Sequence, residues 1–253
     1  MTKARYQIVG HRGWPQQCPE NSIRGVVEAI TAGVHAEIDV QLSADAIPLV
    51  IHDPNTLRTS GTDCEVLTSD YTELAHIVCD EEKRLGKSDK DAVLPRLDTL
   101  AHRVAGIISP GQRLFIEIKE HSIDKFGIEQ TFAAILPAME QLSENAVFIS
   151  FHYDFLRYVK SRCDIPVGWV LESFDGSCRE QAVALAPQYL IIDCNEIPKH
   201  TALWNYNSID IQNRGVDGTP WQWFIYDVCD PLQAAEWFDR GVSYIESWDF
   251  KAL

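Results

Sequence analysis

The chain is organised around one stretch, IVGHRGWPQQCPENS at residues 8–22 together with VHAEIDVQLSADAIPLVIHD at residues 34–53. Short apolar runs in this stretch end in charged side chains, which is typical of strands that open onto a site. The candidate functional groups of the stretch are His11, Arg12, Glu20, Glu37, Asp39, His52 and Asp53. The rest of the chain is expected to form the scaffold that holds these groups in place.

The first half of this stretch indicates a strand, a loop and a helix. Residues 6–9 are strand-like and stop at the motif GHRG (10–13). A loop with two prolines follows, and Asn21 or Ser22 is placed to cap a helix. Apolar residues recur at helical spacing in that helix until Gly33 ends it.

The second half indicates a β-hairpin. In residues 34–42, acidic and amide side chains alternate with apolar ones, and this period of two puts Glu37 and Asp39 on one face of a strand. A second apolar run at residues 47–51 follows after about four residues, which is too few for a parallel crossover, so the two strands should pair antiparallel. Such a hairpin returns His52 to the height of the two acids.

The remaining chain repeats strand and helix patterns. Strand runs begin near residues 6, 35, 113, 146, 166, 189, 223 and 242. Eight such units in 253 residues predict an α/β fold, the (β/α)8 TIM barrel. We expect a single domain over residues 1–253, with the hairpin extending over the C-terminal mouth. Residues 54–93 are polar and poorly periodic. Within them TSGTD (59–63) and DEEKRLGKSDKD (80–91) are expected to be solvated surface, the second as a charged helix end or loop. A short helical segment is expected near Ile209.

Composition narrows the classes of partner. The net charge of −15, from 22 basic and 37 acidic residues, comes without a basic cluster and excludes nucleic acid as a favoured partner. An anionic small molecule would have to be captured locally, by a metal or an arginine. No apolar run of about 18 residues predicts a transmembrane segment. Seven cysteines without a CxxC pair favour a reducing, cytoplasmic location. The oligomeric state stays open.

Three acids are placed for metal binding. Glu37, Asp39 and Glu117 stand at the C-terminal ends of predicted strands, where the active sites of TIM barrels lie. Clustered carboxylates raise one another's pKa values, and a hard divalent cation removes that conflict. All-oxygen ligation suits Mg²⁺ or Ca²⁺, so one such cation is the expected cofactor.

Two histidines and two cationic side chains complete a set suited to phosphoryl transfer. His11 and His52 each end a strand run, and imidazole titrates near neutral pH, so they are the candidate acid and base. Arg12 and Lys119 bring positive charge to the same mouth, and a guanidinium can bind a phosphate through two hydrogen bonds.

Seven short motifs follow one another along the chain: HRG (11–13), PENS (19–22), EIDV (37–40), VIHD (50–53), LPRL (94–97), EIK (117–119) and SF (150–151). In sequence, order and spacing they resemble the glycerophosphodiester phosphodiesterase family, over roughly residues 6–253. The resemblance implies a TIM barrel whose hairpin carries the second histidine. It also implies divalent-metal-dependent hydrolysis of glycerophosphodiesters to glycerol 3-phosphate and an alcohol.

The same resemblance implies roles for individual residues. It makes the three acids metal ligands, the two histidines the acid–base pair, and Arg12 and Lys119 phosphate contacts. Glu20 of the PENS motif would orient Arg12 or the metal shell. The further candidates for lining the pocket are Phe151, His121, His152, Tyr226 and Trp248.

The C-terminal strand ends depart from the family pattern. The chain reads YDVC at residues 226–229, where the family usually has a WTVN-like strand end, and ESWD at residues 246–249, where a TD-P segment is usual. We expect these positions to line the mouth away from the metal cluster and to shape the pocket for the glycerol or alcohol portion.

Two alternative functions stay open. A lysophospholipase D-type phosphodiesterase would act on a lipid, but the chain shows no amphipathic helix with a basic face for membrane binding. A catalytically silent barrel could bind phosphodiesters, but such a protein would not need both histidines. For the enzyme, the nucleophile at phosphorus is the substrate's own hydroxyl or a water, and which histidine is the acid is not decided.

Overall fold

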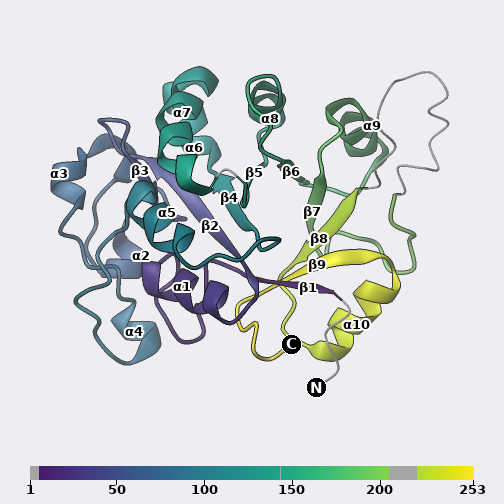
Figure 1. Ribbon diagram of the computed structural model, residues 1–253, viewed down its shortest axis with the longest axis horizontal. Helices are drawn as coiled ribbons and strands as arrows, with labels where there is room; N and C mark the ends of the chain where they lie inside the picture. Colours follow the sequence, from purple (N-terminus) through teal and green to yellow (C-terminus); the bar gives the residue numbers. More distant parts are fainter. Residues whose placement is uncertain (1–5, 143, 205–220) are drawn as a thin grey trace.

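The structure is a computed structural model that describes residues 6–142, 144–204 and 221–253. In these residues a closed barrel of eight parallel strands carries a ninth, antiparallel strand (Figure 1). The barrel strands are β1 (Gln7–Gly10), β2 (His35–Leu42), β4 (Leu114–Ile118), β5 (Ala146–Ser150), β6 (Val167–Val170), β7 (Tyr189–Asp193), β8 (Gln222–Tyr226) and β9 (Val242–Ser247). Strand β1 pairs with both β2 and β9, and this pairing closes the barrel. The predicted TIM barrel is therefore confirmed.

Helices alternate with the strands and surround the barrel in Figure 1. They are α1 (Ile23–Thr31), α5 (Leu97–Ala105), α6 (Glu120–Phe126), α7 (Ile128–Ile135), α8 (Tyr153–Lys160), α9 (Gly176–Leu185) and α10 (Pro231–Asp239), with a 3₁₀ segment η2 (Leu136–Leu142) after α7. Ser22 caps α1 by accepting a hydrogen bond from the Gly25 N–H. The helical segment expected near Ile209 lies outside the described residues.

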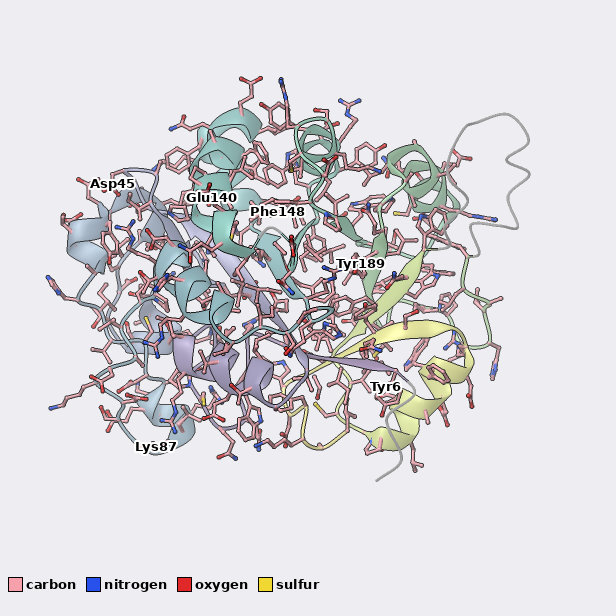
Figure 2. The ribbon with its side chains drawn as sticks, in the orientation of Figure 1. Tyr6, Asp45, Lys87, Glu140, Phe148 and Tyr189 are labelled. Carbon is pink, nitrogen blue, oxygen red and sulfur yellow. The ribbon has the colours of Figure 1, made fainter. Side chains whose placement is uncertain are left out.

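Alternation along the strands separates two layers of core. On β4, Ile116 and Ile118 face the surrounding helices, whereas Phe115 and Glu117 face the interior of the barrel. The Phe115 ring meets the rings of Tyr189 and Phe224 edge-on, with centroids 5.1 and 4.9 Å apart. These aromatic rings fill the lower barrel, so the polar groups above them stand on a packed floor. Figure 2 shows Tyr189 within the body of the barrel.

The predicted hairpin is also confirmed. Strand β3 (Pro48–Val50) runs antiparallel to β2, with Val40 opposite Val50 and Leu42 opposite Pro48. The turn between them projects outward, as the position of Asp45 in Figure 2 shows. The hairpin therefore extends one barrel strand beyond its neighbours and brings the chain back toward the mouth.

Residues 54–93 are more ordered than their composition indicates, and the solvated surface expected at residues 59–63 and 80–91 is present for most but not all of their residues. This segment forms α2 (Leu57–Ser60), the 3₁₀ turn η1 (Val66–Thr68), α3 (Tyr71–Leu74) and α4 (Glu82–Leu85), which lie beside the hairpin in Figure 1. It packs around a small core of its own, made by Leu49, Ile51, Val66, Leu74, Cys79 and Leu94. Asp80 and Glu81, predicted to be solvated, are buried. The helices are single turns, too short to show a helical period in the sequence.

Candidate active site

A cavity of about 330 Å³ opens at the C-terminal ends of the barrel strands. Among the predicted site residues, its lining includes His11, Arg12, Glu37, Asp39, His52, Glu117, Lys119, Phe151 and Tyr226. These residues come from both halves of the sequence and meet because parallel strands all end at the same rim. The barrel thus brings the predicted chemistry together in one place.

Three carboxylates form the first feature of the cavity. Oxygens of Glu37, Asp39 and Glu117 lie within 4.8 Å of one another. Burial raises the pKa of Glu37, and the neighbouring charges of Asp39 and Glu117 raise it further. The Glu37 Oε1 is buried without a hydrogen-bond partner among the described residues. A cation among these oxygens would satisfy that atom and relieve the repulsion, so the donor set fits a hard divalent metal.

Two cationic side chains hold Asp39 ionised. Lys119 Nζ lies 2.6 Å from Glu117 and 3.4 Å from Asp39, and Arg12 Nε lies 3.3 Å from the other oxygen of Asp39. Burial alone would raise the pKa of Asp39, but the charges of Lys119, Arg12 and His52 lower it well below its usual range. The cluster therefore contains Asp39, which is ionised, next to Glu37, whose negative charge is unfavourable.

The HRG motif forms a tight turn that places Arg12. Arg12 has a φ of 52° and Gly13 a φ of 88°, and a Cβ on Gly13 would lie 2.7 Å from the backbone of α1. This turn lets the Arg12 backbone N–H donate to Glu37 at 2.9 Å while its guanidinium binds Glu20 at 3.0 Å. The contact predicted between Glu20 and Arg12 is present.

Each candidate proton carrier has a carboxylate partner. His52 Nδ1 lies 2.7 Å from Asp53, and His11 Nδ1 lies 2.9 Å from Asp227. The other oxygen of Asp227 accepts a hydrogen bond from Trp248 Nε1 at 2.7 Å. A carboxylate on Nδ1 fixes that nitrogen as the protonated one in the neutral ring and leaves Nε2 for a ligand.

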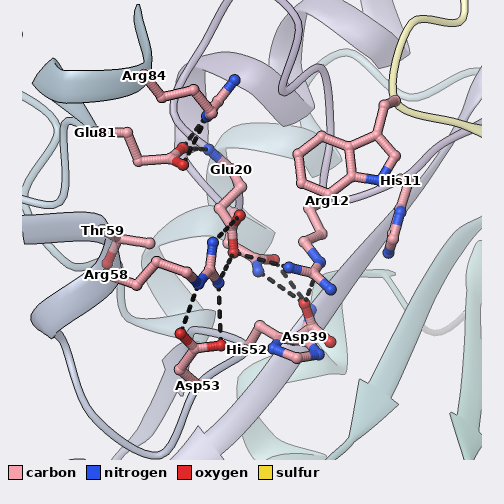
Figure 3. Close-up of polar contacts among 12 residues, drawn as sticks. His11, Arg12, Glu20, Asp39, His52, Asp53, Arg58, Thr59, Glu81 and Arg84 are labelled. Carbon is pink, nitrogen blue, oxygen red and sulfur yellow. Dashed lines mark hydrogen bonds and ion pairs between the residues drawn. The ribbon is translucent and has the colours of Figure 1, made fainter.

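Arg58 was not predicted, and it links the two halves of the polar network. Its guanidinium donates to both oxygens of Glu20 at 2.7 Å and to Asp53 at 2.6 and 3.0 Å, as Figure 3 shows. Burial would raise the pKa of Glu20, but the hydrogen bonds from Arg58 and the charge of Arg12 lower it. Arg58 thereby connects Glu20, which binds Arg12, to Asp53, which binds His52.

Glu81, which caps α4, and Arg84 within α4 support the same network. Glu81 accepts a hydrogen bond from the Glu20 backbone N–H at 2.7 Å and forms an ion pair with Arg84. The Arg84 guanidinium also donates to the carbonyls of Pro15 and Cys18. The charged segment around residues 80–91 therefore fixes the loop between β1 and α1, as Figure 3 shows for Glu81 and Glu20.

Three of the five further candidates for lining the pocket take other positions. His121 is exposed on α6, and His152 accepts a hydrogen bond from the Phe155 N–H as the N-cap of α8. Neither belongs to the lining of the cavity. Both follow strand ends, but the chain has already turned into the next helix there. Trp248 is not a lining residue either; it packs edge-on against His11 at 5.4 Å.

The expectation that the C-terminal strand ends lie away from the metal cluster was wrong. Asp227 bonds His11, and Glu246 is buried and lines the cavity. Burial raises the pKa of Glu246 well above its usual value, and the charge of Glu37 raises it further. The same signal that identified Glu117, an acid at the end of an apolar run, is present at both positions.

The chain resembles known proteins over most of its length. A family model described as the glycerophosphoryl diester phosphodiesterase family matches residues 11–193. The glycerophosphodiester phosphodiesterase of Caldanaerobacter subterraneus subsp. tengcongensis is 29% identical over 198 residues, covering 73% of this chain and 76% of that protein. Human glycerophosphodiester phosphodiesterase 1 is 24% identical over 148 residues, covering 58% of this chain, and the match spans only 43% of the human protein.

A solved structure shares the fold. The phosphodiesterase of Oleispira antarctica, solved in complex with the product sn-glycerol-3-phosphate, superposes with a TM-score of 0.78 at 23% identity. The match covers 97% of this chain and 94% of that one. The range matched by the family model runs from His11 to Asp193, well over half the chain, and it includes the acid cluster and both histidines. The chain belongs to the glycerophosphoryl diester phosphodiesterase family.

Proposed function

We propose that this protein is a metal-dependent phosphodiesterase that hydrolyses glycerophosphodiesters to glycerol 3-phosphate and an alcohol. The observation that carries the proposal is the placement of the carboxylate cluster and both histidines on one cavity. Family membership supports the same reaction. A binding protein would have no use for two imidazoles that are each oriented by a carboxylate.

Glu37, Asp39 and Glu117 would hold one divalent cation, Mg²⁺ or Ca²⁺. Their oxygens converge within 4.8 Å, and the unpartnered Glu37 Oε1 gives the cation a ligand that nothing else in the described residues satisfies. When bound, the cation supplies positive charge that withdraws electrons from the phosphoryl group.

The chain's own groups would bind and orient the phosphate. Arg12 and Lys119 both line the cavity, and each forms an ion pair with Asp39 of the carboxylate cluster. Their charges offset the negative phosphodiester and the charge that grows on it during in-line displacement. Glu20 and Arg58 hold the Arg12 side chain in place, so little reorganisation is needed when substrate arrives.

His11 and His52 would carry the protons. One imidazole accepts the proton of the attacking hydroxyl, from the substrate or from water, and the other donates a proton to the leaving alkoxide. Asp227 and Asp53 keep each ring in the tautomer that presents Nε2 to the cavity. The two carboxylate–imidazole pairs are alike, so the assignment of acid and base is left to experiment.

Metal removal and histidine substitution test the proposal. EDTA should abolish hydrolysis of glycerophosphocholine, and Mg²⁺ or Ca²⁺ should restore it. His11→Ala and His52→Ala should each lower kcat by roughly 10²–10⁴-fold. His102→Ala is the matched control, because His102 is exposed on α5, outside the cavity, and its ring bonds Gln141. Near-wild-type turnover in both variants would refute the acid–base assignment.

A substrate panel separates this activity from its rivals. Glycerophosphocholine, glycerophosphoethanolamine and glycerophosphoinositol should be cleaved in preference to lysophosphatidylcholine, because most of the residues that line the cavity are charged or polar. Preference for the lysolipid would favour a lysophospholipase D, and binding without cleavage of any diester would favour a silent barrel.

Across the described residues no helix has the length and apolar character to cross a membrane. We further propose a cytoplasmic location, which the seven free thiols support.

A further inference from the structure

A second group of potential ligands lines the same cavity, at β1 and the strands next to it on the side away from β2. His11 follows β1, Asp227 follows β8 and Glu246 lies on β9, and their ligand atoms fall within 4.8 Å of one another. Strand β9 pairs with both β1 and β8, so the three residues stand on adjacent strands. The carboxylate cluster described above comes instead from β2 and β4.

Glu246 is the residue that shows this group to be incomplete. Its side chain is 4% exposed and lines the cavity, yet its Oε1 has no hydrogen-bond partner among the described residues. A buried carboxylate oxygen without a partner destabilises a folded protein, because it loses its hydration without gaining a hydrogen bond. The repulsion from Glu37 and Asp227 makes the position still less favourable. The Glu246 carboxylate therefore borders open space in the cavity and would be stabilised by a positively charged ligand.

The surrounding side chains do not supply a positive charge to Glu246. Six acids line the cavity, namely Glu37, Asp39, Glu117, Asp193, Asp227 and Glu246, against the two cationic side chains of Arg12 and Lys119. Both cations already form ion pairs with Asp39. Within the described ranges no lysine or arginine forms an ion pair with Asp227 or Glu246. A single divalent cation on the other cluster leaves this side of the cavity negative.

We propose that His11, Asp227 and Glu246 form a second divalent-cation site, and that its occupation inhibits the enzyme by removing His11 from proton transfer. One imidazole nitrogen with two carboxylates suits Mn²⁺ or Zn²⁺ better than Ca²⁺, which prefers oxygen ligands alone. The 2.9 Å between His11 Nδ1 and Asp227 Oδ1 is compatible with two ligands of the same ion, each about 2.1 Å from it.

The inhibition follows from the tautomer of His11. With Asp227 as partner, Nδ1 carries the proton and Nε2 keeps the lone pair that can accept another. A cation bound at Nδ1 requires the tautomer in which the lone pair is on Nδ1, so the single proton of the neutral ring moves from Nδ1 to Nε2. The ring then has no lone pair to offer the cavity. This consequence rests on the proposed function, whereas binding of the cation does not.

Metal counting in the whole protein tests the site without substrate. The metal-free protein is titrated with Mn²⁺, and free Mn²⁺ is read from its six-line electron paramagnetic resonance signal. The wild type should bind a first and then a second equivalent. Glu246→Gln should lose one of them, with its dissociation constant raised roughly 10–100-fold or more. Glu117→Gln should weaken only the other.

Two controls keep the result specific. Asp193→Asn removes one acid from the same cavity but lies outside the ligand group, so it should keep both equivalents. Glu246→Gln replaces an unpaired buried carboxylate with a neutral amide of the same shape, so its circular dichroism and thermal unfolding should show an intact fold. Asp227→Asn provides a second variant that should lose the same equivalent.

Activity then tests the inhibition. The rate of the wild type should rise with Mn²⁺ and fall again as the second equivalent binds, whereas the rate of Glu246→Gln should rise without the fall. One equivalent in the wild type, or two in both the wild type and Glu246→Gln, would overturn the site. Two equivalents without the falling phase would overturn the inhibition. Failure of the proposed activity would appear separately, as no turnover at any Mn²⁺ concentration.

Discussion

The stability of this barrel should depend on pH through one buried histidine, His35. It begins β2 at the end of the barrel opposite the cavity, and it is 5% exposed. Its Nδ1 accepts a hydrogen bond from the Arg113 backbone N–H at 2.8 Å, and its Nε2 lies 3.1 Å from the Gln7 Oε1. A proton on Nδ1 would break the first of these bonds. Burial, and then the charge of Arg113, lower the pKa of His35 to about 4.

The sign and size of the effect follow from linkage. An unfolded chain binds a proton at histidine below about pH 6.5, whereas the folded protein binds it only below about pH 4. Folding is therefore favoured by this residue above pH 6.5, and the benefit is lost as the pH falls toward 4. At about 1.4 kcal/mol per pH unit, the loss is about 1.4 kcal/mol by pH 5.5 and about 3 kcal/mol by pH 4.

Urea unfolding of the wild type and His35→Gln isolates this contribution from other titrating groups. Glutamine offers an acceptor to Arg113 but does not titrate, so the difference between the two free energies of unfolding should be largest at pH 8. It should shrink by about 1.4 kcal/mol at pH 5.5, a pH still above the sequence pI of about 4.9. A difference that is the same at both pH values would refute the assignment of a neutral, hydrogen-bonded His35.

Three further substitutions test the polar network. Gly13→Ala should lower the free energy of unfolding by about 2–4 kcal/mol in urea titrations, because φ is 88° and the added Cβ meets the backbone of α1. Arg58→Ala should cost about 1–3 kcal/mol in the same assay, since Glu20 keeps only one of its two guanidinium partners. Asp227→Asn should lower kcat about 10²-fold or more in steady-state assays, because both of its oxygens accept hydrogen bonds and an amide can accept only one of them.

The fold and the centre of the site could be predicted because their signals are local. The period-2 alternation of residues 34–42 set Glu37 and Asp39 on one face, and a gap too short for a crossover required the hairpin that returns His52. Both follow from the geometry of neighbouring residues. The barrel then brings Glu117 to the same rim without any further information, because parallel strands end together.

The supporting network could not be predicted because its partners are distant in sequence and its helices are short. Arg58 lies in the single helical turn α2, and Glu81 directly precedes the single turn α4. Neither turn contributes a residue to the small core of this segment. The turns lack a full helical period, and the segment resembles solvated surface in composition. Their partner, Glu20, lies 38 and 61 residues earlier in the chain. Only the packed structure shows that these charges are paired and partly buried.

Asp227 and Glu246 were missed for a different reason. Each stands at or just after the end of a strand, like Glu117, so the sequence did contain their signal. The family pattern expects other residues at those ends, and the departure suggested a change in the alcohol pocket. In the structure they face His11 and Glu37 instead. Acids at strand ends of a barrel should therefore be grouped by their position on the rim before any resemblance assigns them separate roles.

The two unpartnered carboxylate oxygens lower the free energy of unfolding of the fold that carries the site. Glu37 and Glu246 are both buried, both have raised pKa values, and each keeps an Oε1 without a partner among the described residues. A core selected for stability alone would carry apolar or amide side chains there. The aromatic rings below and the outer ring of helices supply the packing that tolerates this repulsion. A cation bound at these oxygens would offset the repulsion, so we expect cation affinity to depend on the packing of the whole barrel.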